Sequence, residues 1–176
     1  MVKKNIVLIG FMGTGKTTIC RLLAERLQRR FVDIDDLIEK RAGKPIAQIF
    51  KEEREARFRE LEVKVIRDAA KMEGGIISCG GGAVINRINA ERLKKNAVVV
   101  LLVASPETIL ERALNGKRPL LNGDNRVERI ELLLEERDRF YREVADYQID
   151  TTGLDENATV EKILAWVREE RDESHN

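Results

Sequence analysis

Residues 5–18 read NIVLIGFMGTGKTT, an apolar run followed by a glycine-rich turn and the start of a helix-like segment. The turn between Gly10 and Thr17 matches the pattern G-x-x-x-x-G-K-[ST] of a phosphate-binding loop. Its glycines allow successive backbone N–H groups to face phosphate oxygens, and the helix behind them adds positive charge at its N-terminus. We therefore expect nucleotide contacts from Gly13, Thr14, Gly15, Lys16, Thr17 and Thr18.

Outward from this loop, short β-branched runs alternate with longer helix-like segments, which is typical of a parallel sheet covered by helices. Strands are predicted at 5–9, 31–34, 76–79, 97–103 and 148–150. Helices are predicted at 16–29, 35–42, 46–71, 90–95, 106–114, 127–146 and 159–170. The sequence therefore predicts an α/β fold of three layers.

Length and charge restrict the classes of function. A chain of 176 residues fits one domain, 1–176, and its net charge of +1 provides no field to hold nucleic acid or an anionic membrane. We find no signal peptide and no apolar run long enough for a membrane span, so we expect a cytoplasmic protein. We also expect a monomer, with Cys20 and Cys79 as free thiols and no catalytic task for His175 in the polar tail.

Three further groups of residues indicate an acceptor site. Asp33 and Asp35 follow the second strand, and the triple glycine 80–82 follows the third, at the end of the sheet where such folds bind ligands. The segment 115–125 is long and rich in Gly and Asn, which is typical of a lid, and it carries Arg118. Plainer interpretations remain open at this point: a helix cap for Asp35 or Asp36 and a simple turn for the glycines.

Taken together, these motifs resemble the shikimate kinase family. The resemblance runs from residue 6 to residue 151 through GFMGTGKTT, FVDIDDLIE, GKPIAQIF, FRELE, SCGGGAV, RPLL and the R-x-x-x-Y at 137–141. It implies a sheet in the order 2-3-1-4-5, Mg²⁺ with ATP as the phosphate donor, and phosphorylation of the 3-hydroxyl of shikimate. It also implies an acceptor-binding helical region at about 35–62.

The resemblance assigns roles to individual residues. It implies that Lys16, Asp35 and Arg118 are catalytic and that Thr17 and Asp33 lie in the magnesium shell. It also implies two further nucleotide contacts: Arg112 stacks on the adenine, and Arg118 meets the phosphates. For shikimate it implies Asp35 at the hydroxyls, Arg59 and Arg137 at the carboxylate, and backbone contacts from Gly80, Gly81 and Gly82. The pocket would be framed by Ile46, Phe50, Phe58, Glu62, Pro119 and Leu120. Asp35 could also take the hydroxyl proton, although phosphoryl transfer depends mainly on positioning and charge.

Departures from the family pattern lie at Cys20, Arg54 and the pair Arg139-Phe140. The family usually has glycine where this chain has Arg54, so we expect a straighter helix there and an altered position of Arg59. Three other functions stay open: a kinase for a related acid such as gluconate, a nucleotide-binding regulatory module, and, least favoured by the charge balance, a nucleic-acid-binding ATPase. An intact Lys16, Thr17, Asp33 and Arg118 disfavours the regulatory module.

Cys79 directly precedes the triple glycine, so its thiol should lie close to the acceptor pocket. Free cysteines are usually small, buried and inert, and we favour that interpretation. The alternative is a thiol that faces the pocket, where neighbouring cations would favour the reactive thiolate.

Overall fold

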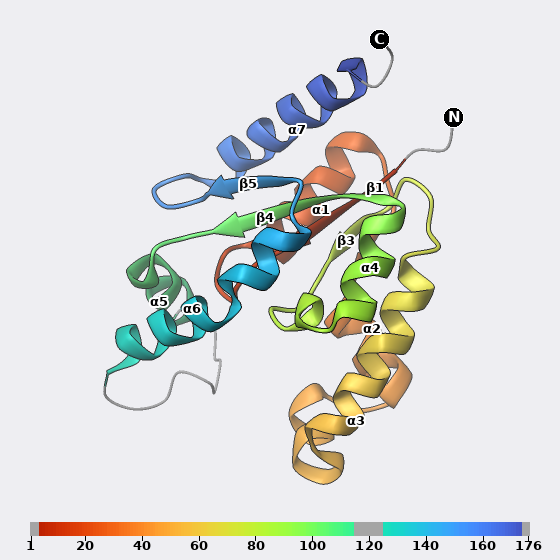
Figure 1. Ribbon diagram of the computed structural model, residues 1–176, viewed down its shortest axis with the longest axis vertical. Coiled ribbons are helices and arrows are strands. Elements are labelled where there is room, and N and C mark those ends of the chain that lie inside the picture. The colour runs from red at the N-terminus through yellow and green to blue at the C-terminus, as the bar shows by residue number, and fades with distance from the viewer. Residues whose placement is uncertain (1–3, 115–124, 174–176) are drawn as a thin grey trace.

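The computed structural model describes residues 4–114 and 125–173. Its five strands form one parallel sheet in the order β2-β3-β1-β4-β5 (Figure 1). This confirms the predicted fold class and strand order. The strands are β1 (Asn5–Ile9), β2 (Phe31–Asp33), β3 (Ile76–Ser78), β4 (Ala97–Val103) and β5 (Tyr147–Asp150).

Helices cover both faces of the sheet and account for every predicted helical segment (Figure 1). Two of them, α1 and α7, pack together on one face, whereas α3, α4 and α6 lie over the other. The helices are α1 (Lys16–Leu27), α2 (Ile34–Ala42), α3 (Ile46–Ala69), α4 (Arg87–Lys95), α5 (Pro106–Leu114), α6 (Arg126–Val144) and α7 (Glu156–Glu173), with a short 3₁₀ helix η1 (Ala83–Ile85) that was not predicted.

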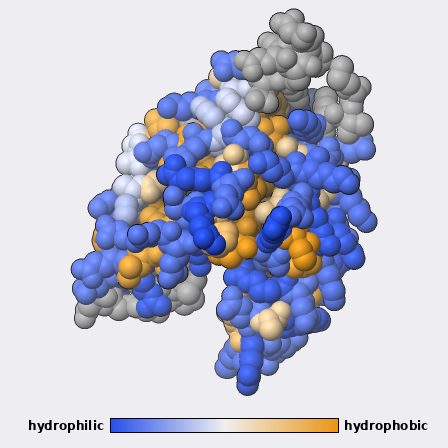
Figure 2. Space-filling model, in the orientation of Figure 1, coloured by the Kyte–Doolittle hydropathy of each residue, from blue (hydrophilic) through white to orange (hydrophobic). Residues whose placement is uncertain are grey.

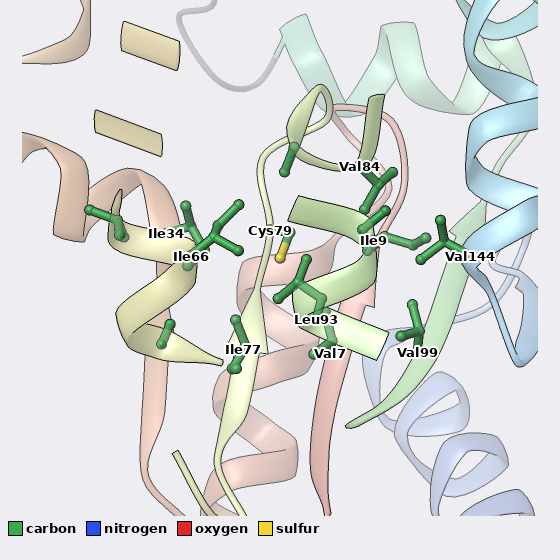
Figure 3. Close-up of a cluster of buried hydrophobic side chains, with 14 of the residues drawn as sticks. Val7, Ile9, Ile34, Ile66, Ile77, Cys79, Val84, Leu93, Val99 and Val144 are labelled. Atoms are coloured by element: carbon green, nitrogen blue, oxygen red, sulfur yellow. The ribbon is translucent and has the colours of Figure 1, made fainter. Parts of the chain in front are cut away.

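The core follows the alternation of side chains along the strands. In β1, Val7 and Ile9 join the cluster under α3 and α4, whereas Ile6 and Leu8 join the cluster under α1 and α7. Figure 3 shows Val7 and Ile9 in the first of these clusters, close to Val99 from β4. A strand with both faces buried needs apolar residues at every position, which explains the uninterrupted apolar run in β1.

Capping residues explain why two helices begin earlier than predicted. The Asn86 side chain accepts a hydrogen bond from Ile88 N at 2.9 Å, so α4 starts at Arg87. Before α7, the Asp155 carboxylate accepts a hydrogen bond from Ala158 N at 2.7 Å. Asn and Asp are favoured at these positions because they satisfy N–H groups that have no partner within the helix.

Arg54 interrupts α3 instead of straightening it. Its φ and ψ angles are 66° and 175°, so the helix is broken there into an N-terminal part and a longer C-terminal part that carries Arg59. This backbone region is populated almost only by glycine, because a side chain there collides with its own backbone. The expectation of a straighter helix was therefore wrong: the break persists and Arg54 bears the strain.

We expect Arg54→Gly to raise the free energy of unfolding by about 1 kcal/mol, since relief of strain of roughly 1–3 kcal/mol exceeds the entropy cost of glycine. Denaturant unfolding of both proteins measures the change. Lys51→Gly is the matched control, because Lys51 is an exposed residue in the helical part of α3 and should lose ~0.5–1 kcal/mol. A loss of equal size in both variants would contradict the prediction.

The parallel strands all end at the same edge of the sheet, and the segments that follow β1, β2 and β3 meet there. The visible face of the molecule is mostly hydrophilic, with a notch between the part that carries α5 and α6 and the part that carries α2 and α3 (Figure 2). Among the helices of residues 4–114 and 125–173, none combines the length and apolar character that crossing a membrane requires.

Candidate active site

The loop between β1 and α1 can be formed only with glycine at its key positions. Gly10, Gly13 and Gly15 have φ angles of 138°, 79° and 91°, which side chains rarely allow. A Cβ atom on Gly10 would also lie 2.3 Å from the carbonyl oxygen of Leu102. The loop therefore has the backbone conformation that the phosphate-binding motif predicted.

Lys16 lies in the first turn of α1 and reaches back over the loop. Its Nζ donates a hydrogen bond to the carbonyl oxygen of Phe11 at 2.7 Å, and only 9% of the residue is exposed. The ammonium group is thereby placed at the mouth of the loop, beside the N-terminus of α1. Both features attract an anion to the same point.

Oxygen atoms from three elements meet next to the loop. Thr17 Oγ1 donates to Asp33 Oδ2 at 2.9 Å and lies 3.5 Å from Ser78 Oγ. The described residues contain no group of three His, Cys, Asp or Glu side chains that could hold a metal ion by itself. A hydroxyl and a carboxylate beside a phosphate site instead suit a hard cation that takes its other ligands from phosphate and water.

Asp33 has a second task as the N-cap of α2. Its Oδ1 accepts a hydrogen bond from the backbone N–H of Asp35 at 2.9 Å. The helix-cap interpretation therefore applies to Asp33, and not to Asp35 or Asp36. The cap fixes the start of α2 and leaves the Asp35 side chain directed toward the triple glycine.

Asp35, Arg59 and Arg137, the three side chains predicted to bind the acceptor, converge at the triple glycine. A Cβ atom on Gly80 would lie 2.8 Å from Asp35 Oδ1, and one on Gly82 would lie 2.9 Å from both terminal nitrogens of Arg59. A Cβ atom on Gly81 would lie 3.5 Å from Arg137 Nη1. Contacts under 3.0 Å mean that a side chain at Gly80 or Gly82 would displace the Asp35 carboxylate or the Arg59 guanidinium from its present position.

Arg59 is held by two carboxylates of its own helix. Its Nη1 lies 3.0 Å from Glu62 Oε2, and its Nη2 lies 3.1 Å from Glu55 Oε1. Only 1% of the Glu62 side chain is exposed, and burial raises the pKa of this carboxyl although Arg59 acts in the opposite direction. Glu62 thus fixes the guanidinium over Gly82.

Arg137 approaches the glycines from α6. Its Cζ lies 5.5 Å from the centre of the Phe11 ring, so an aromatic face of the phosphate-binding loop supports the cation. One turn further along α6, Tyr141 donates a hydrogen bond from its hydroxyl to the carbonyl oxygen of Gly81. The R-x-x-x-Y pattern therefore brings both side chains to the same loop.

Arg112 lies at the other side of the phosphate-binding loop. Its Nη1 and Nη2 donate to Thr151 Oγ1 and Thr151 O, each at 3.0 Å, so the plane of the guanidinium is fixed. A cavity of about 280 Å³ extends from Arg112 past the loop to Asp35 and the triple glycine. Its lining includes Gly13, Gly15, Lys16, Thr17, Thr18, Asp33, Asp35, Ser78, Gly80, Gly81 and Arg112.

The remaining pocket residues have mixed outcomes. Phe50 and Phe58 pack with their ring centres 4.9 Å apart, next to Arg59, whose Cζ lies 5.1 Å from the Phe58 ring centre. Ile46 packs at the edge of the core cluster under α3. Arg118, Pro119 and Leu120 lie outside the described residues, as does nearly all of the predicted lid 115–125.

Sequence reasoning missed two supporting residues. Ser78 ends β3, and its position opposite Asp33 follows from the β2–β3 register, which the sequence alone does not give. Thr151, which fixes Arg112, directly follows β5. A polar residue at the C-terminal end of a parallel strand was the signal available for both.

Cys79 is buried, which confirms the favoured interpretation of a small buried thiol. Although it contributes to the cavity wall, only 1% of the residue is exposed, and Figure 3 shows its sulfur inside the apolar cluster. Burial raises the pKa of the Cys79 thiol, and the nearby carboxylates of Glu62 and Asp33 act in the same direction. The thiolate is therefore disfavoured, and the reactive alternative does not apply. Cys20 is likewise buried, on the packing face of α1.

The arrangement combines a phosphate cradle with an adjoining triple glycine at which two guanidinium groups and a carboxylate gather. Arg59 and Arg137 can each bind a carboxylate through two N–H groups, and Asp35 can accept a hydrogen bond from a hydroxyl. The site is thus suited to transfer a phosphoryl group to a small hydroxylated acid.

Proteins with a similar sequence and the same fold are named as kinases of a small hydroxylated acid. The sequence matches the shikimate kinase family over residues 12–168. It is 47% identical over 167 residues to a shikimate kinase of Pelotomaculum thermopropionicum, a match that covers 94% of this chain and 96% of that protein. A solved shikimate kinase of Acinetobacter baumannii in complex with shikimate superposes with a TM-score of 0.90, at 39% identity and over 96% of this chain and 94% of that one.

A gluconokinase from Sinorhizobium meliloti superposes less closely, with a TM-score of 0.66 at 16% identity, over 99% of this chain and 97% of that one. At that identity the likeness shows a common fold and nothing about the acceptor. The family match covers most of the chain, and the relative at 47% identity covers 94% of it. The chain therefore belongs to the shikimate kinase family.

Proposed function

We propose that the protein transfers the γ-phosphate of ATP to the 3-hydroxyl of shikimate, which gives shikimate 3-phosphate and ADP on the route to chorismate and the aromatic amino acids. The observation that carries the proposal is the convergence of Asp35, Arg59 and Arg137 on three glycines beside the phosphate-binding loop. Membership of the family and the neighbour that was solved with shikimate support the same acceptor.

The acceptor end binds and orients. Arg59 and Arg137 hold the carboxylate of shikimate, and the glycine backbone supports its ring. Asp35 accepts a hydrogen bond from the 3-hydroxyl and takes its proton while the new O–P bond forms and the bond from the γ-phosphorus to the ADP oxygen breaks. Holding both reactants in line accounts for much of the rate, because phosphoryl transfer requires little covalent chemistry from the protein.

The donor end stabilises charge. Lys16 leaves the Phe11 carbonyl to reach the β- and γ-phosphates, and Arg112 packs on the adenine. Thr17 and Asp33 would hold Mg²⁺, which when bound neutralises charge on those phosphates. Arg118, assigned from the sequence motif, completes the set of cations at the transferred group.

A coupled assay of ADP release with shikimate, with gluconate and without acceptor tests the proposal. We expect Mg²⁺-dependent turnover with shikimate and only background release in the other two reactions. Faster turnover with gluconate would reassign the acceptor to a related polyol acid. Nucleotide binding without turnover on either acid would indicate a regulatory module and would contradict the proposal.

We further propose that the chain acts as one monomeric kinase domain in the cytoplasm, with shikimate and ATP as its partners. The net charge of +1 supports a function without nucleic acid or membrane, because neither polyanion would be attracted over the whole surface. Light scattering coupled to size exclusion measures the mass directly.

A further inference from the structure

The backbone of the triple glycine is fixed by hydrogen bonds to its carbonyl groups. Gly80 O accepts from Ala83 N at 3.0 Å, and Gly82 O accepts from Ile85 N at 3.2 Å. The carbonyl groups of Gly81 and Ala83 are bound instead by side chains, from Tyr141 of α6 and from Asn89 of α4.

All four consecutive carbonyl groups therefore accept hydrogen bonds within the protein. Glycine has the widest conformational freedom, so three glycines in a row would lose much entropy on being ordered. Hydrogen bonds from Tyr141 of α6 and Asn89 of α4 help to order this segment.

Asn89 provides one of the two side-chain ties and is placed unusually for an amide. The residue is 0% exposed, and its Nδ2 donates to Ala83 O at 3.1 Å. Its Oδ1 is buried without a hydrogen-bond partner in the described structure. Ala83, whose carbonyl the amide binds, and Leu93, one turn further along α4, belong to the core cluster on this face of the sheet. Figure 3 shows Leu93 within that cluster.

A buried amide oxygen without a partner lowers stability, so what favours an amide at this place is the hydrogen bond from Nδ2 to Ala83 O. Asn5 offers the comparison. It is also buried, but its Nδ2 donates to Met72 O and its Oδ1 accepts from Gly75 N, each at 2.7 Å. Asn5 therefore stabilises the fold with both ends of its amide, whereas Asn89 uses only the end that holds the glycine turn.

We propose that Asn89 is a positioning residue for acceptor binding: through Ala83 O it fixes the turn that brings Gly80, Gly81 and Gly82 against Asp35, Arg137 and Arg59. The inference rests on the proposed function, because the acceptor whose binding it describes is shikimate. Asn89 itself does not touch the acceptor. Its effect passes through the backbone to the three charged groups.

The test is Asn89→Leu, which keeps the size of the side chain and removes both amide groups. We expect the KM for shikimate to rise about 10-fold or more, since small misplacements of binding groups are costly. The KM for ATP should stay within twofold of wild type. The melting temperature should fall less than in Asn5→Leu, because loss of the donor to Ala83 O is offset by removal of the unpaired Oδ1. Hydrogen exchange of the peptide that contains residues 80–83 should become faster.

Asn5→Leu is the matched control, because Asn5 ties the backbone at the opposite end of β1, far from the acceptor. It should lower the melting temperature and leave the KM for shikimate unchanged. Tyr141→Phe provides a second variant, which removes only the hydroxyl bound to Gly81 O and should raise the KM for shikimate without changing that for ATP.

An Asn89→Leu protein with an unchanged KM for shikimate would overturn the proposal, as would a parallel rise in the KM for ATP, which would indicate general loosening. Absence of shikimate-dependent turnover in the wild type is a separate result and would overturn the proposed function. In that case hydrogen exchange still decides about Asn89, because unchanged exchange of residues 80–83 in Asn89→Leu would show that the amide does not hold the turn.

Discussion

Lys16→Ala is expected to lower kcat by at least about 100-fold, because removing one preorganised donor to a developing negative charge commonly costs this much. The Lys16 ammonium lies at the mouth of the phosphate-binding loop, where it is bound to Phe11 O and can exchange that carbonyl for phosphate oxygens. Steady-state ADP release at saturating ATP and shikimate measures the loss.

Lys51→Ala is the control for this experiment, since Lys51 is an exposed lysine of α3. It should retain the kcat of the wild type. The melting temperature of Lys16→Ala must be measured as well, because a protein that has unfolded would also lack activity. A folded Lys16→Ala protein with an unchanged kcat would show that the loop does not act on the transferred phosphate.

Arg59→Ala and Arg137→Ala are each expected to weaken shikimate binding by roughly 2–5 kcal/mol, the usual cost of truncating one partner of a desolvated ion pair. ATP binding should stay nearly intact, because both guanidinium groups lie at the triple glycine, and Arg137 contacts the phosphate-binding loop at the Phe11 ring, which offers no hydrogen bond to a phosphate. Calorimetric titration of each ligand separately provides the measurement. Loss of ATP affinity alone would show that both residues have been misplaced.

The two arginine variants should differ in stability. Arg59→Ala leaves Glu62 buried without its partner, whereas Arg137 has no buried carboxylate beside it in the described structure. Combining Arg59→Ala with Glu62→Gln should therefore restore stability and leave shikimate binding weak. Arg87→Ala is the control, because Arg87 is a surface arginine whose ion pair with Glu91 is exposed.

Much of the fold could be predicted because hydrophobic patterns report burial directly. The apolar runs of β1 and β4 required strands covered on both faces, and the alternation of strands and helices required a parallel sheet. Helix starts were less predictable. The side chains of Asn86 and Asp155 act as caps, but a single polar residue before an amphipathic segment gives a weak signal.

The candidate site was predictable where a residue type is tied to one backbone conformation or one chemistry. The glycines of the phosphate-binding loop and Lys16 belong to this class. Arg54 does not, because the sequence shows only that glycine is absent and not whether the chain then straightens or accepts strain. Asn89 and Ser78 were missed since their roles depend on how the strands and α4 are placed together.

The pairing of Arg59 with Glu62 also bears on which anion enters which end of the cavity. Glu62 and Glu55 offset the charge of Arg59, so a carboxylate at the acceptor end is bound mainly by directed N–H···O hydrogen bonds, and this end presents little net positive charge to a polyphosphate. Lys16, with the N-terminus of α1 behind it, presents positive charge at the other end. The two ends of the site therefore differ in net charge. This difference favours the polyphosphate of ATP at the Lys16 end and the carboxylate of the acceptor at the Arg59 end.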